Sequence, residues 1–100
     1  MNTKHSVGII GAGFIAQEHI QVLNSLPEVK LQGIFDIQKE KAVSLSKKYK
    51  ISEVFDSVEH IIKNKLCDSV HIIVPPNFHM QAALPFLDAG INVFMEKPLA

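Results

Sequence analysis

Short apolar runs alternate along this chain with longer segments in which apolar residues recur every three or four positions. A short apolar run bounded by polar or glycine residues is typical of a buried strand, and the longer spacing is typical of an amphipathic helix. The runs predict five strands, at His5–Ile10, Lys30–Asp36, Glu53–Phe55, Asp68–Val74 and Ile91–Met95. The periodic segments predict four helices, at Phe14–Ser25, Gln38–Tyr49, Val58–Lys65 and Phe78–Ala89.

Strands that alternate with helices of this length indicate an α/β fold with a parallel sheet and right-handed crossovers. We expect a doubly wound sheet of about five strands in the order 3-2-1-4-5, with helices on both faces. Asp56 or Ser57 is placed to cap the third helix, and Gly90 to end the fourth. A ligand crevice is expected where the strand order reverses, between the first and fourth strands.

The turn after the first predicted strand carries a glycine motif. Gly11, Gly13 and Ala16 spell G-x-G-x-x-A, the fingerprint of Rossmann-type dinucleotide binding. Gly11 allows the tight turn, Gly13 lets the backbone approach a pyrophosphate, and the small Ala16 lets the helix pack close to the strand. The N–H groups at the start of that helix then face the phosphates. The motif is weak evidence alone, but here a strand precedes it and a helix follows.

Asp36 stands at the end of the second predicted strand, 20 residues after Ala16. A dinucleotide fold places there the carboxylate that binds the adenosine ribose, and this charge would repel the 2′-phosphate of NADP. The alternative is an aspartate that only caps the following turn. NAD is therefore expected over NADP, although Lys39 and Lys41 offer positive charge nearby.

Two further stretches follow predicted strands at the crevice. In the first, Pro75 fixes the backbone, Asn77 either caps a helix or faces the crevice, and His79 either lines the crevice or is structural. In the second, Lys97 is placed to contact a substrate hydroxyl and transfer its proton, and Glu96 to bind a ribose hydroxyl. The alternative for this Glu-Lys pair is a solvated ion pair at a strand end.

Composition narrows the class of protein. With 10 basic and 10 acidic residues the formal net charge is 0, so neither nucleic acid nor an acidic membrane surface is an expected partner. No apolar run approaches the length of a membrane span, and the N-terminus lacks a secretory signal, so we expect a cytoplasmic protein.

Cys67 is the single cysteine and is expected to be a small buried residue. No spacing of ligands predicts a metal site. The other histidines are expected to be structural or on the surface: His5, His19, His60 and His71.

Taken together, these motifs resemble the N-terminal domain of the glucose–fructose oxidoreductase/inositol 2-dehydrogenase (Gfo/Idh/MocA) family. The resemblance covers essentially the whole chain, and E-K-P at 96–98 is its more specific motif. It implies NAD(P)-dependent transfer of a hydride to or from a hydroxyl of a sugar, cyclitol or polyol. It implies Lys97 as the catalytic residue. It implies cofactor contacts from Gly11, Gly13, Phe14, Ile15, Ala16, Asp36, Pro75, Asn77, His79, Glu96 and Lys97. Val74 departs from the family, which commonly has threonine there.

Members of this family also carry a second domain that supplies the substrate pocket and usually the oligomer interface. We therefore expect residues 1–100 to be a dinucleotide-binding domain truncated from a longer, homo-oligomeric enzyme, and to be inactive alone. The alternative is a non-catalytic sensor or regulatory protein that binds NAD(H). Lys97 favours the enzyme, because a sensor has no need of it.

Overall fold

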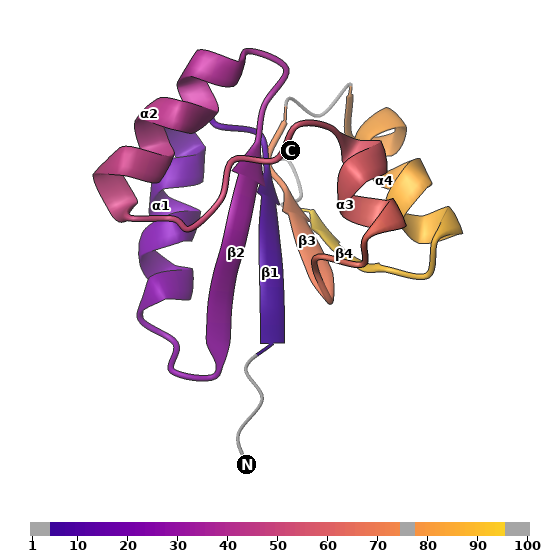
Figure 1. Cartoon of the computed structure of the whole chain (residues 1–100), viewed down its shortest axis with the longest axis horizontal. Coiled ribbons are helices and arrows are strands. Elements are labelled where there is room, and N and C mark those ends of the chain that lie inside the picture. Colours follow the sequence, from indigo (N-terminus) through magenta and orange to yellow (C-terminus); the bar gives the residue numbers. More distant parts are fainter. Residues whose placement is uncertain (1–4, 75–77, 96–100) are drawn as a thin grey trace, which may run out of the picture.

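A parallel sheet forms the middle layer of the structure, with helices on both sides (Figure 1). The structure is a computed structural model that describes residues 5–74 and 78–95. Its strands are β1 (His5–Ile10), β2 (Val29–Phe35), β3 (Ser69–Ile72) and β4 (Asn92–Met95). Its helices are α1 (Phe14–Asn24), α2 (Lys39–Tyr49), α3 (Val58–Lys63) and α4 (His79–Asp88).

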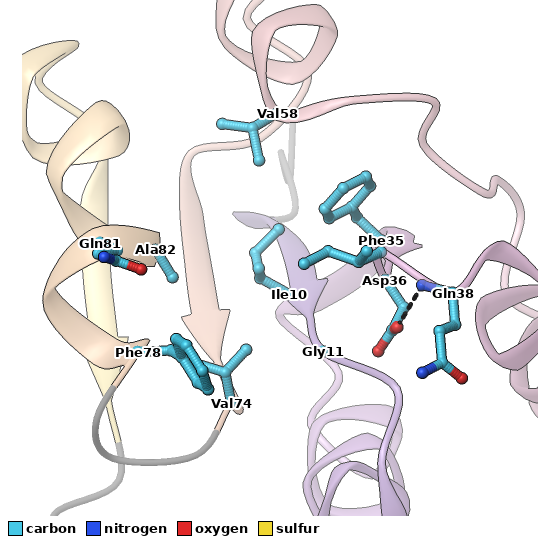
Figure 2. A pocket seen from close by; sticks show the side chains of 11 residues that line it. Ile10, Gly11, Phe35, Asp36, Gln38, Val58, Val74, Phe78, Gln81 and Ala82 are labelled. Carbon is cyan, nitrogen blue, oxygen red and sulfur yellow. Dashed lines mark hydrogen bonds between the residues drawn. The ribbon is translucent and has the colours of Figure 1, made fainter.

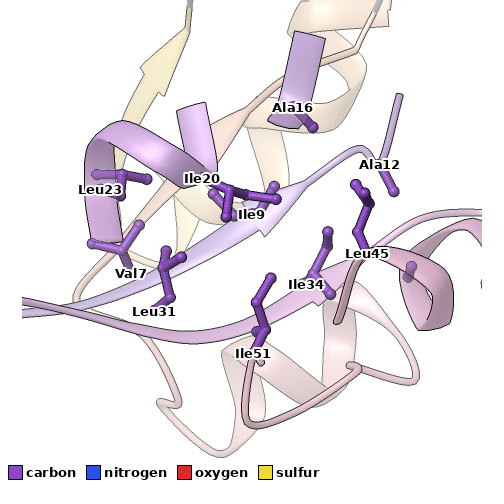
Figure 3. Close-up of a cluster of buried hydrophobic side chains, with 11 residues drawn as sticks. Val7, Ile9, Ala12, Ala16, Ile20, Leu23, Leu31, Ile34, Leu45 and Ile51 are labelled. Atoms are coloured by element: carbon purple, nitrogen blue, oxygen red, sulfur yellow. The ribbon is translucent and has the colours of Figure 1, made fainter. Parts of the chain in front are cut away.

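Alternation along β1 builds a separate core on each face of the sheet. Val7 and Ile9 point to one face, where they meet apolar side chains of α1 and α2 (Figure 3). Ile10 points to the other face, where it meets residues of α3 and α4, including Ile61 and Phe86. Successive strand residues face opposite sides, so a central strand covered by helices on both faces is apolar throughout. The doubly wound α/β fold is therefore confirmed.

The strand order reverses beside β1. The sheet runs β2-β1-β3-β4, all parallel, so the chain moves outward from β1 in one direction to β2 and in the other to β3. The carboxyl ends of β1 and β3 lie side by side, with Ile10 opposite Ile72. Such a switch point is where parallel α/β sheets leave room for a ligand.

The predicted third strand, Glu53–Phe55, is shortened to a single bridge. Val54 pairs with Ile34 through two backbone hydrogen bonds, Ile34 N to Glu53 O at 3.0 Å and Phe55 N to Ile34 O at 2.9 Å. The segment thus has the predicted place beyond β2, but the named strands number four and not five. Too few residues lie between the bend at Ser52 and Asp56 to extend the ladder.

Helix ends follow local backbone chemistry. Ser57 caps α3, because its hydroxyl oxygen accepts the His60 N–H at 3.0 Å. The helix ends at Lys63 and does not reach Lys65, which has φ of +50°. At the end of α4, Gly90 takes φ of +78°, as the prediction of a glycine stop required.

Two glycines in the sheet make room for large neighbours. A Cβ on Gly8 would lie 2.8 Å from Cys67 Sγ, and a Cβ on Gly33 would lie 2.5 Å from the ring of Phe55. The Phe55 side chain, 2% exposed, therefore packs directly onto the sheet. Within residues 5–74 and 78–95, no helix combines the length and apolar character that crossing a bilayer requires.

Candidate dinucleotide-binding site

Gly11 forms the turn out of β1 and cannot be replaced without a clash. Its φ is +109°, a conformation that side chains with a Cβ rarely adopt. A Cβ there would also lie 2.2 Å from the carbonyl oxygen of Ile73. The Gly11 N–H donates to Phe35 O at 2.7 Å, so the turn is fastened to the end of β2. The fold itself therefore requires this glycine.

Gly13 differs, because nothing in the described protein occupies the space beside it. It has an ordinary φ of −80°, and apart from its two chain neighbours no described atom lies within 4 Å of the position that a Cβ would take. It is the N-cap residue of α1, whose described start has no side-chain cap and no acidic residue in its first turn. A helix start of this kind presents backbone N–H groups and a positive dipole end, which favour an anion.

Ala16 and Ile15 follow in the first turn of α1. Ala16 is fully buried in the cluster under α1 and α2, and its N–H donates to Gly13 O at 3.1 Å. A small residue is thus needed for the close packing of helix on sheet, as predicted. Ile15 is exposed, with 51% of its surface accessible. Phe14 begins the helix, and its side chain lies outside the described part of the chain.

Asp36 joins the glycine-rich turn to the end of β2. One carboxylate oxygen accepts the Ala12 N–H at 2.7 Å, across 24 positions of sequence. The other accepts the Gln38 N–H at 2.8 Å, the dashed line in Figure 2. The second contact is the turn-capping role considered as an alternative. Each oxygen has a further lone pair, so these bonds leave acceptor capacity for a ribose hydroxyl.

A cavity of about 540 Å³ opens at the carboxyl ends of β1 and β2, beside the turn (Figure 2). Asp36 and Gln38 supply polar groups on one side, and α3 and α4 supply a wall that is mainly apolar. The residues that line it are Ile10, Gly11, Phe35, Asp36, Ile37, Gln38, Val58, Val74, Phe78, Gln81 and Ala82. A mostly apolar cleft with a few convergent polar groups is typical of a cofactor site.

Several predicted site residues lie outside the described part of the chain: Pro75, Asn77, Glu96 and Lys97. Val74 and Phe78, the described residues on either side of 75–77, both line the cavity. His79 is the first residue of α4, and its side chain is not among those described. The roles of these residues remain predictions.

The apolar cavity wall was not predicted as part of the site. Val58 comes from the start of α3, while Phe78 and Ala82 come from α4 and the residue before it. The spacing of Phe78 and Ala82 by four positions is a helical-face signal, but only the packing of α4 beside β3 makes it part of a cavity.

Two titratable groups away from the cavity, Cys67 and His71, have shifted pKa values. Burial, with the nearby Asp68 and Glu53 carboxylates, raises the pKa of Cys67 to about 12, so its thiol stays protonated at neutral pH. Burial, then the charges of His19 and His5, lowers the pKa of His71. The His71 ring stacks on Phe94 with centroids 5.0 Å apart. Among the described residues, no group of three or more His, Cys, Asp or Glu side chains is placed to hold a metal ion.

This combination of a doubly wound parallel sheet, a glycine-rich turn at its switch point and a carboxylate after the second strand defines a Rossmann-type dinucleotide-binding domain. A family model described as an oxidoreductase family with an NAD-binding Rossmann fold matches residues 5–100. The chain therefore belongs to the Gfo/Idh/MocA oxidoreductase family, and NAD is its cofactor class. The resemblance drawn from the sequence motifs is confirmed.

Known oxidoreductases are similar to this chain over nearly its whole length. Inositol 2-dehydrogenase of Corynebacterium glutamicum is 29% identical over 100 residues, which are 99% of this chain and 30% of that protein. Glucose-6-phosphate 3-dehydrogenase of Bacillus subtilis is 35% identical over 95 residues, 94% of this chain and 26% of that protein. The solved structure of GenD2 from gentamicin A biosynthesis, in complex with NAD, has a TM-score of 0.87 at 26% identity and covers 98% of this chain and 28% of its own. This chain thus spans less than a third of the length of these relatives.

Proposed function

We propose that this chain holds NAD(H) at the glycine-rich turn and the adjoining cavity, as the cofactor-binding part of an enzyme that oxidises a hydroxyl of a sugar, cyclitol or related polyol. The observation that carries the proposal is the contrast between two glycines. Gly11 is required by the protein's own backbone, whereas no described residue beyond its chain neighbours fills the space beside Gly13. A glycine that the fold does not require, at the uncapped start of a helix, is explained by a ligand that approaches the backbone there.

Each part of the dinucleotide has a proposed partner. The pyrophosphate lies on the first turn of α1, with backbone contacts from Gly13, Phe14 and Ile15 and with Gly11 and Ala16 shaping the turn. The adenosine ribose donates its hydroxyls to the carboxylate of Asp36, which the Ala12 and Gln38 N–H groups already orient. That negative charge disfavours the 2′-phosphate of NADP.

The proposed chemistry uses residues at the carboxyl ends of β3 and β4. Bound NAD supplies the hydride acceptor. Lys97 accepts the proton of the substrate hydroxyl, while Glu96 binds the nicotinamide ribose, and Pro75, Asn77 and His79 line the nicotinamide side. The sugar or polyol substrate class is supported by the names of the relatives, an inositol 2-dehydrogenase and a glucose-6-phosphate 3-dehydrogenase. A reducing, cytoplasmic compartment is supported by the buried thiol of Cys67, which is not in a disulfide. Assembly into a homo-oligomer is supported by the family resemblance.

The binding claim is tested by titrating the chain with NADH and NADPH and following cofactor fluorescence. Asp36→Asn removes the charge but keeps an oxygen that can accept the Ala12 N–H. We expect this variant to stay folded and to lose most of the preference for NADH. Asp88→Asn, at the opposite end of α4 from the cavity, is the matched control and should bind as the original chain does. A folded chain that binds neither dinucleotide would contradict the proposal.

The catalytic claim is tested in the enzyme that carries this domain together with its substrate-binding residues. Lys97→Ala should reduce hydride transfer by about 10²–10⁴-fold, the usual contribution of a positioned acid–base group. Lys97→Arg is the matched control for charge and should be nearly as slow, because a guanidinium does not give up its proton. Unchanged turnover by Lys97→Ala would refute the assignment and favour a non-catalytic role.

A further inference from the structure

We propose that Asp56 helps to set the preference for NAD over NADP, by neutralising Lys39 at the adenosine end of the cavity. This inference rests on the proposed function. Lys39 begins α2, three residues after Asp36, and its Nζ lies 3.3 Å from Oδ1 of Asp56. Neither residue lines the cavity itself, but each is a near neighbour in sequence of one that does, Lys39 of Gln38 and Asp56 of Val58.

The chemistry of the 2′-phosphate makes this pair relevant. A phosphate monoester carries close to two negative charges at neutral pH, and sites that accept NADP place a cation near the end of the second strand. Lys39 is the first cation after Asp36 along the chain, so it is the natural candidate to accept such a phosphate. Its ammonium group instead pairs with Asp56. With Asp56 included, this part of the chain has three carboxylates, Asp36, Glu40 and Asp56, and two ammonium groups, Lys39 and Lys41.

Within the described part of the chain, Asp56 does not cap the helix that follows it. The adjacent Ser57, and not Asp56, accepts the His60 N–H and caps α3. The Lys39 and Asp56 side chains are 65% and 73% exposed, and exposed ion pairs contribute little to stability. The effect of Asp56 is therefore on the electrostatic field at the ribose, and its removal should leave the fold intact.

The test measures binding with probes that isolate the adenosine end. The chain is titrated with NADH and NADPH, and with 5′-AMP and 2′,5′-ADP, at about 20 mM and about 0.3 M salt. Asp56→Asn should raise affinity for the two 2′-phosphorylated ligands about three- to tenfold at low salt, because one negative charge is removed from the surroundings of a dianion in water. The gain should shrink at high salt, where the screening length is shorter. Affinity for NADH and 5′-AMP should change less than about twofold.

Two control variants make the result specific. Asp56→Asn combined with Lys39→Gln should lose the gain, because the unpaired ammonium is then absent. Asp88→Asn removes an exposed carboxylate of the same type at the far end of α4 and should leave the NADH-to-NADPH ratio unchanged.

The outcomes separate this inference from the function on which it rests. Normal NADH binding with an unchanged ratio in Asp56→Asn would overturn the inference and leave the proposed function standing. A gain that persists without Lys39, or that is equal for NADH and NADPH, would also overturn it. A folded original chain that binds no dinucleotide would overturn the proposed function and this inference together.

Discussion

Replacing Gly13 with alanine separates a glycine kept for a ligand from one kept for the fold. The added Cβ meets no described atom within 4 Å, and the φ of −80° suits alanine. Alanine is the poorer N-cap by up to about 1 kcal/mol. Loss of glycine's flexibility in the unfolded chain restores about 0.4–1 kcal/mol. The two effects oppose each other, so the free energy of unfolding should change by no more than about 1 kcal/mol in either direction.

Gly11→Ala is the matched substitution in the same turn. It combines the strain of a φ of +109°, about 1–3 kcal/mol, with a Cβ placed 2.2 Å from a backbone oxygen that cannot move aside without disturbing the chain after β3. Overpacking of this kind costs about 1–3 kcal/mol more. A loss of about 2–6 kcal/mol is a large share of the stability of a domain of this size. This variant should melt far below the original chain.

NADH binding is the property that Gly13→Ala should impair. The Gly13→Ala methyl group occupies the approach of the pyrophosphate, so hydrogen bonds to its charged oxygens, about 1.5–3 kcal/mol each, are lost or lengthened. Affinity for NADH should fall at least about tenfold while the melting temperature stays nearly constant. The assay is a fluorescence titration beside thermal unfolding followed by circular dichroism. Unchanged affinity in a folded Gly13→Ala chain would refute the reasoning, as would a parallel loss of stability and binding.

Three further predictions concern stability and reactivity. Gly8→Ala should lower the free energy of unfolding by about 1–3 kcal/mol, because its Cβ would lie 2.8 Å from Cys67 Sγ. Denaturant unfolding should show that adding Cys67→Ala recovers most of this loss. Purely additive effects of the two substitutions would contradict the reasoning. The pKa of His71 is lowered in the folded protein, so as the pH falls the unfolded chain is protonated at this histidine before the folded chain is. The free energy of unfolding should therefore fall as the pH drops below about 6.5. Thermal melts of His71→Gln should show a less steep fall. Because its pKa is about 12 and it is 6% exposed, Cys67 should resist alkylation at pH 8 until denaturant is added; rapid labelling of the folded chain would count against its burial.

Local sequence patterns determined the element types, the fold class and the family. Apolar runs and helical spacing predicted the four named strands and four helices within a few residues, because each segment's periodicity states which side chains must be buried. The glycine motif predicted the turn after β1 for a similarly local reason. Gly11 needs a positive φ that few other residues adopt. Its spacing from that motif made Asp36 the candidate for the carboxylate that binds the adenosine ribose.

Only the tertiary structure decided which distant groups meet. It shortened Glu53–Phe55 to one bridge, joined Asp36 to Ala12, and paired Lys39 with Asp56. It also gathered the cavity wall from two helices. These contacts span many positions of sequence, and their geometry depends on strand register and helix packing. A local pattern carries no information about either, so the sequence by itself determined the kind of site, and the folded chain determined its electrostatics and its shape.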